Sequence, residues 1–140
     1  MKVYYAVIDT NVLVSAMLSR KSAPGEIIRH LLEGRIIPLL HEEILDEYRD
    51  VLNRPKFGWP GKVAEGIIRE IETRGVYADA IIVEEVLPDP DDRIFYEVVM
   101  EKRKTEDAYL VTGNVKHFPV KPFVVTPRQM LDLLEGDGDV

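Results

Sequence analysis

The chain has 140 residues, a length that fits one compact domain, and its formal net charge is −7. It contains no cysteine, no apolar run near the roughly 20 residues of a membrane span and no signal-peptide cleavage site, so we expect a cytoplasmic protein without disulfides or thiolate metal sites. The negative charge argues against a protein that holds nucleic acid by bulk positive charge, but not against one that handles nucleic acid through bound cations.

Short apolar runs alternate with longer segments of helical period along the chain. The runs are rich in β-branched and aromatic residues and predict buried strands at 3–8, 36–40, 80–83, 108–112 and 123–125. The helical segments are 11–19, 24–33, 41–53, 62–74, 91–103 and 127–134. This alternation predicts an α/β fold, a three-layer α/β/α sandwich with a central, mostly parallel sheet of four to five strands. One domain is expected over 1–134, followed by an acidic, glycine-bearing tail at 135–140 that we expect to be disordered.

The first predicted strand runs directly into an aspartate, in the stretch VYYAVIDTNVLVSA. Drawing a carboxylate such as Asp9 toward a core costs free energy unless it has a partner. In an open parallel sheet, function gathers at the carboxyl ends of the strands, and Asp9 lies at that edge. The fourth strand ends in LVTGN, which brings Thr112 and Asn114 to the same edge.

Two helices add acids near this edge. The helix before the fourth strand opens with DPDDRIFYEVV, and at 100° per residue Asp92 falls within the apolar stripe of Tyr96 and Val99. In the helix HEEILDEYRDVLN, Glu47 lies closest to the buried face and Glu43 comes next, one turn earlier. The remaining acids of that helix point toward solvent: Glu42, Asp46 and Asp50.

The expected gathering of Asp9, Glu47 and Asp92 predicts a metal site, with Asn114 as a fourth ligand. Several carboxylates at close range repel one another and do not all stay ionised alone. A divalent cation resolves this, and oxygen donors without Cys or His suit Mg²⁺ or Mn²⁺. The histidines, His30, His41 and His117, lack metal-ligand spacing, whereas Lys116 and His117 are candidate contacts for a substrate phosphate.

Each residue also has a purely structural interpretation. Asp9 or Asn11 would cap the helix that follows. Asp89, Pro90 and Asp92 match an N-cap, a first-turn proline and a capping box. Glu47 alone is typical of the boundary of an amphipathic helix. The coincidence of all these positions at one edge favours the functional interpretation.

Five segments carry a resemblance to a known family: VIDTNVLVSAML, HEEILDEYRDVLNRPKF, DPDDRIFYEV, YLVTGNVKHFP and VVTPRQML. In this order and spacing the chain resembles the PIN-domain family, in its branch of toxin components of toxin–antitoxin systems (VapC-like ribonucleases). The resemblance implies Mg²⁺- or Mn²⁺-dependent cleavage of RNA, a homodimer, and silencing by a small antitoxin protein. The family's acids fall on Asp9, Glu47 and Asp92, and its fourth acidic position is here Asn114, which leaves a second metal in question.

The expected reaction is phosphodiester hydrolysis by a metal-activated water. Asp9 and Asp92 would be direct ligands, Glu47 would bind the metal or orient the water, and Asn114 would hold a second metal weakly or a metal-bound water.

Three other classes of protein share features with this sequence. A haloacid-dehalogenase-type, metal-dependent phosphatase needs D-x-D, but the third residue here is Asn11. A phosphoacceptor receiver domain needs an acidic pair near the first strand and a lysine after its last strand, and the chain has neither. A PIN fold that binds RNA or an antitoxin without cutting stays open, and Asn114 favours it.

Overall fold

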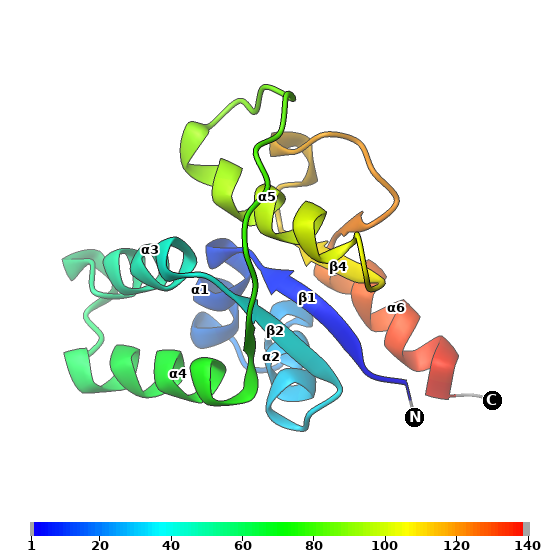
Figure 1. The fold of residues 1–140 in the computed structure, drawn as a ribbon. Helices are drawn as coiled ribbons and strands as arrows, with labels where there is room; N and C mark the ends of the chain where they lie inside the picture. The colour runs from blue at the N-terminus through cyan, green and yellow to red at the C-terminus, as the bar shows by residue number, and fades with distance from the viewer. Residues whose placement is uncertain (1, 139–140) are drawn as a thin grey trace.

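The computed structural model describes residues 2–138, in which five strands and six helices alternate (Figure 1). The strands are β1 (Tyr4–Ile8), β2 (Ile36–Leu40), β3 (Val76–Tyr77), β4 (Ala108–Val111) and β5 (Val124–Val125). The helices are α1 (Thr10–Leu18), α2 (Ala23–Leu32), α3 (Glu42–Leu52), α4 (Gly61–Arg74), α5 (Arg93–Lys102) and α6 (Pro127–Gly138). Three short 3₁₀ turns lie between them: η1 (Pro55–Phe57), η2 (Pro90–Asp92) and η3 (Val115–His117).

The strands form one sheet in the order β3-β2-β1-β4-β5, and every neighbouring pair is parallel. The order changes direction at β1, whose neighbours are β2 on one side and β4 on the other. Ile8 is in register with Val111, so these two strands end together. The Asp9 amide then donates to the Val111 carbonyl at 2.9 Å. This switch in strand order is the edge at which parallel sheets bind ligands.

Helices cover both faces of the sheet, which confirms the predicted three-layer α/β/α sandwich. Helix α5 packs against β1 and β4 on one face, while α2, α4 and α6 pack against strands on the other (Figure 1). Helix α3 contacts α1, α4 and α5 and so connects the layers. The sheet's side chains are largely buried; Ala6, Val7 and Leu110 are completely so.

The predicted strand at 80–83 is wrong. Pairing with β2 occurs earlier, at Val76–Tyr77, directly after Gly75. A Cβ at Gly75 would lie 2.6 Å from the Pro38 carbonyl oxygen, so only glycine allows this close approach. Residues 78–88 then cross α5 as an irregular segment, here called the strap, in which Ile82 is 90% exposed.

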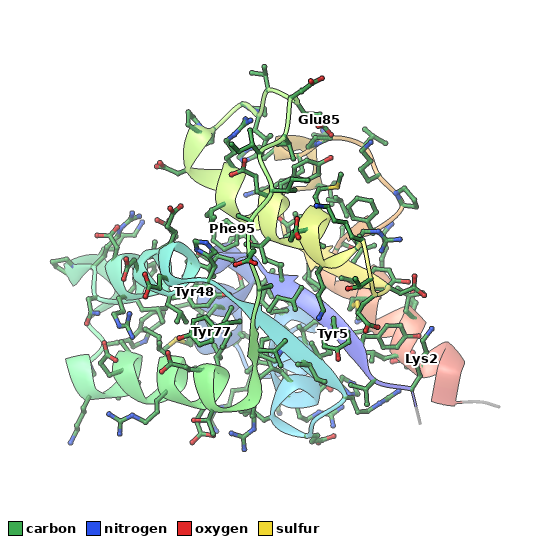
Figure 2. All side chains as sticks on the ribbon, viewed as in Figure 1. Lys2, Tyr5, Tyr48, Tyr77, Glu85 and Phe95 are labelled. Atoms are coloured by element: carbon green, nitrogen blue, oxygen red, sulfur yellow. The ribbon has the colours of Figure 1, made fainter. Side chains whose placement is uncertain are left out.

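The strap forms hydrogen bonds with side chains of α5 where a strand would bond to a neighbouring strand. Arg93 donates to the carbonyls of Val83 and Glu85, and the Tyr96 hydroxyl donates to the Glu85 carboxylate. Glu85 is labelled at the top of Figure 2, where the strap turns toward α5. The two Arg93 bonds satisfy backbone carbonyls that a sheet would otherwise pair.

The last helix is longer than predicted. Helix α6 continues through Gly138, so residues 135–138 are helical rather than part of a disordered tail, and residues 139–140 lie outside the described residues. The extent of the single domain stays a prediction. No helix within residues 2–138 is long and apolar enough to cross a membrane.

Candidate functional site

Two aromatic side chains join the acid-bearing helices to the end of β1. Tyr48 of α3 is fully buried and its hydroxyl donates to the Ile8 carbonyl at 2.5 Å. Its ring lies 6.5 Å from that of Phe95 on α5, and Figure 2 labels both side chains where the two helices approach. Burial raises the pKa of the Tyr48 hydroxyl, which therefore stays protonated as a donor. The chain segments that carry Glu47, Asp92 and Asp9 are thus tied together.

Asp9 follows β1 and is only 5% exposed. Its Oδ2 accepts from the Thr112 hydroxyl at 2.8 Å and from Asn11 Nδ2 at 3.3 Å. Burial raises the pKa of Asp9 to about 6; the Thr112 bond opposes this, and the charges of Asp92 and Glu47 add to it. Its side chain makes no capping bond to α1, so the interpretation of Asp9 as a helix cap is not supported.

Asp92 ends the η2 turn and precedes α5. Asp89 caps this turn by accepting from the Asp91 amide at 2.9 Å, as the capping interpretation of that residue predicted. The Asp92 side chain remains free of that cap, is 18% exposed, and lies with its Oδ2 3.4 Å from His117 Nδ1. Burial raises the pKa of Asp92, and the Asp89 charge adds to this, while His117 opposes it.

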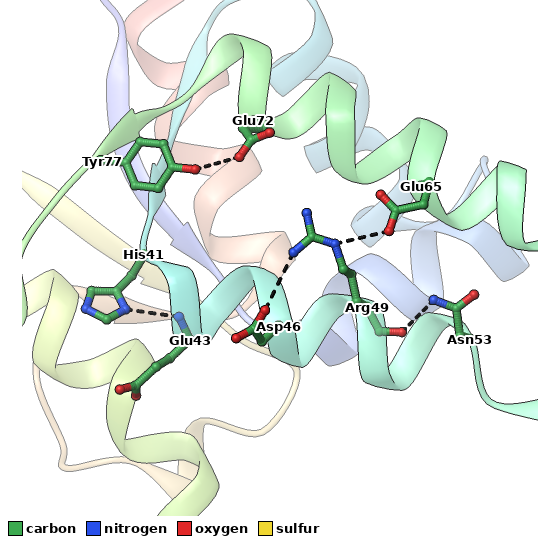
Figure 3. Close-up of polar contacts among 8 residues, drawn as sticks. All are labelled: His41, Glu43, Asp46, Arg49, Asn53, Glu65, Glu72 and Tyr77. Carbon is green, nitrogen blue, oxygen red and sulfur yellow. Dashed lines mark hydrogen bonds and ion pairs between the residues drawn. The ribbon is translucent and has the colours of Figure 1, made fainter.

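Glu47 is half-buried on α3, whereas Glu43 is exposed, as the predicted helical phase requires. Burial raises the pKa of Glu47, and the charges of Asp50, Asp91 and Asp92 contribute. The opposite side of α3 faces α4, where Arg49 bridges Asp46 and Glu65 (Figure 3). Figure 3 shows Glu43 pointing away from α4. Both glutamates line an acidic pocket of about 270 Å³ with residues that include Asp91, Arg93 and Glu97.

Asn114 is exposed and immediately precedes η3 as its N-cap residue. Its backbone amide donates to the Thr112 hydroxyl at 2.9 Å, so a single hydroxyl connects Asn114 to Asp9. Its side chain forms no capping bond to η3. The structure therefore brings the Asn114 backbone to the site, and it brings Asp9, Glu47 and Asp92 near enough for their charges to influence one another.

Several features of this edge suit a divalent cation. No ion pair within residues 2–138 includes Asp9 or Glu47. The Thr10 hydroxyl beside Asp9 is buried without a hydrogen-bond partner in the described part of the chain. The donors are oxygens, the ligands that Mg²⁺ and Mn²⁺ take. However, no group of three His, Cys, Asp or Glu side chains among residues 2–138 is arranged to hold a metal ion, so the carboxylates would have to draw together around one.

Sequence reasoning missed two contacts of this site. Tyr48 lies in the apolar stripe of its helix, and a tyrosine within such a stripe signals a buried hydroxyl that needs a partner. The sequence predicts that His117 contacts a substrate phosphate, whereas the structure places its ring beside Asp92. The sequence signal for this contact is that His117 follows Asn114 by three residues. Lys116 is exposed on the same turn.

A family model described as a PIN domain matches residues 5–116, which is 112 of the 140 residues. The matched range contains Asp9, Glu47, Asp92 and Asn114 and ends within η3, one residue before His117. No curated protein matches the chain, and no solved structure matches it.

Proposed function

Because the chain belongs to the PIN domain family, which has a nuclease-type fold, we propose that it is a Mg²⁺- or Mn²⁺-dependent endoribonuclease. One observation supports this proposal: Asp9 follows β1 at the switch in strand order, the charges of Asp92 and Glu47 add to the rise of its pKa, and burial raises the pKa of all three acids. Acids kept in such unfavourable surroundings are typical of functional sites.

The side chains have distinct roles in this proposal. A bound cation would lower the pKa of a water molecule and neutralise charge on the phosphate. Asp9, held by Thr112, and Asp92, at the start of α5, would be its ligands. Glu47 is less buried than Asp9 and would bind the cation or accept a proton from the attacking water. Asn114 would offer an uncharged oxygen at a weaker second position.

We propose further that the protein is the toxin of a toxin–antitoxin pair, acts in the cytoplasm and forms a homodimer. The support is the resemblance of the five segments quoted above to that branch of the family. A small antitoxin protein that covers the acidic edge would silence the enzyme.

The proposal is tested by RNA cleavage in Mn²⁺, in Mg²⁺ and in EDTA. We expect the unaltered protein to cleave RNA only with the metals, and Asp9→Asn to lose cleavage while unfolding cooperatively. The matched control is Asp132→Asn, an exposed acid on α6, which should cleave like the unaltered protein. Equal cleavage by Asp9→Asn would refute the proposal.

A second candidate is a PIN fold that binds RNA or an antitoxin without cutting. The observation in its favour is the carboxamide of Asn114 at the fourth acidic position, together with the lack of three converging ligands among residues 2–138. Such a protein would bind RNA equally well in EDTA and in Mn²⁺ and would leave it intact. A metal-dependent phosphatase is the least supported candidate, because Asn11 replaces its second aspartate and bonds instead to Asp9 and Gly113.

A further inference from the structure

A small pocket without charged side chains lies on the α1 side of Asp9. It has a volume of about 190 Å³ and is called here the Asn11 pocket, lined by Asn11, Val12, Ser15, Pro24, Gly113 and Asn114. The acidic pocket of Glu43 and Glu47 differs from it, because four carboxylates line that one with a single arginine. The two pockets therefore offer very different surroundings to a polyanion.

Asn11 joins this pocket to the candidate site. Its Nδ2 donates to Asp9 Oδ2 at 3.3 Å, and its Oδ1 accepts from the Gly113 amide at 3.0 Å. A Cβ at position 113 would lie 3.4 Å from Asn11 Oδ1, which is an ordinary contact, so the Asn11 side chain packs directly beside the backbone of residue 113. A group bound in the Asn11 pocket would thus lie one side chain away from the Asp9 carboxylate.

The chemistry of the lining suits a sugar rather than a phosphate. Val12 and Pro24 supply apolar surface, and Ser15 and Asn114 supply neutral groups that both donate and accept hydrogen bonds. Away from a bound cation, the carboxylates of the acidic pocket repel the phosphates of an RNA strand, so the Asn11 pocket is the more favourable side for a nucleotide next to the cleaved phosphate. A ribose presents a 2′-hydroxyl that also donates and accepts, and this group distinguishes RNA from DNA.

We propose that the Asn11 pocket binds the ribose next to the cleaved phosphodiester and that the Ser15 hydroxyl recognises its 2′-hydroxyl. This inference rests on the proposed endoribonuclease function. Hydrolysis by a metal-activated water makes no chemical use of the 2′-hydroxyl. An effect of removing that hydroxyl therefore reports recognition and not the reaction itself.

The experiment combines one protein change with one substrate change. The cleavage position of the unaltered protein is first mapped on a short labelled RNA in Mn²⁺, and single 2′-deoxy nucleotides are then placed at each position around it. At one position next to the cut, we expect the substitution to lower kcat/KM about tenfold, the effect of one hydrogen bond. With Ser15→Ala, the two substrates should be cleaved at nearly equal rates. The matched control is Ser19→Ala, one turn further along outside the pocket, which should keep the full discrimination.

The possible outcomes separate this inference from the proposed function. If the unaltered protein cleaves no RNA with either metal, the nuclease proposal fails, and the inference fails with it. If it cleaves RNA but no single 2′-deoxy substitution matters, or if Ser15→Ala discriminates as strongly as the unaltered protein, only the ribose subsite is overturned. The ratio of the two rates is the decisive readout, because a general loss of stability in Ser15→Ala would lower both rates alike.

Discussion

Replacing Asp9 with asparagine is expected to stabilise the metal-free protein near neutral pH. The rise of the Asp9 pKa from 3.8 to about 6 corresponds to about 3 kcal/mol, at about 1.36 kcal/mol per pH unit. Because the folded-state pKa is raised, the folded protein binds the proton more tightly than the unfolded chain. The destabilisation is therefore complete above about pH 6 and disappears as the pH falls toward about 4.

Asparagine, like the protonated acid, is neutral and accepts from Thr112 without charge assistance, an effect that the net pKa rise already includes. Asp9→Asn is therefore expected to be more stable by up to about 3 kcal/mol near pH 7. For a chain of this size the melting temperature should rise by about 10 °C. Near pH 4, where Asp9 is protonated in the folded protein, the advantage should vanish.

The assay is urea unfolding in EDTA at about pH 7 and about pH 4.5 for both proteins, with m values compared to confirm the same transition. Asp132→Asn serves as the control for removal of an exposed charge, and its effect should stay within about 0.5 kcal/mol. The reasoning is refuted if Asp9→Asn is the less stable protein near pH 7. It is equally refuted if its advantage is the same at both pH values.

Three further predictions, which involve four substitutions, test other parts of the site. Glu47→Gln should lower the rate of RNA cleavage at least about 100-fold, or roughly 3 kcal/mol, whereas the more exposed Glu43→Gln should cost less than about tenfold; the reverse order would place the wrong glutamate at the metal. In EDTA, Asn114→Asp should melt slightly below the unaltered protein, and the loss in unfolding free energy should not exceed about 0.5 kcal/mol because the residue is exposed. Saturating Mn²⁺ should raise the melting temperature of Asn114→Asp more than that of the unaltered protein by linked binding. Equal rises in the two proteins would mean that residue 114 does not face the site. Tyr48→Phe should cost about 1–3 kcal/mol by leaving the Ile8 carbonyl without its donor, and an unchanged urea midpoint would show that the bond does not matter.

Much of the fold could be predicted from the sequence because its signals are local. Each of the six helices shows an apolar stripe at helical spacing, and the predicted ranges match the observed ones within a few residues, apart from the longer α6. Four strands are apolar runs that lie buried in the sheet. The α3 phase that separates Glu47 from Glu43 follows from the same periodicity, and the observed burial agrees with it.

The errors have long-range causes. The segment AIIV at 80–83 has the composition of a strand, but the close approach of Gly75 to Pro38 lets the pairing with β2 begin four residues earlier, at Val76. Arg93 donates hydrogen bonds to the carbonyls of Val83 and Glu85 in the strap. No local sequence pattern predicts these bonds. The bonds of Tyr48 to Ile8 and of Thr112 to Asp9 join residues 40 and 103 positions apart, so they depend on the finished sheet.

A calorimetric titration with Mn²⁺ tests most directly the claim that the carboxylates at the end of β1 hold a divalent cation. The account predicts saturable binding to the unaltered protein, strong loss of binding in Asp9→Asn and in Asp92→Asn, and unchanged binding in Asp132→Asn. Metal binding that persists undiminished in Asp9→Asn, or no binding by the unaltered protein, would contradict it.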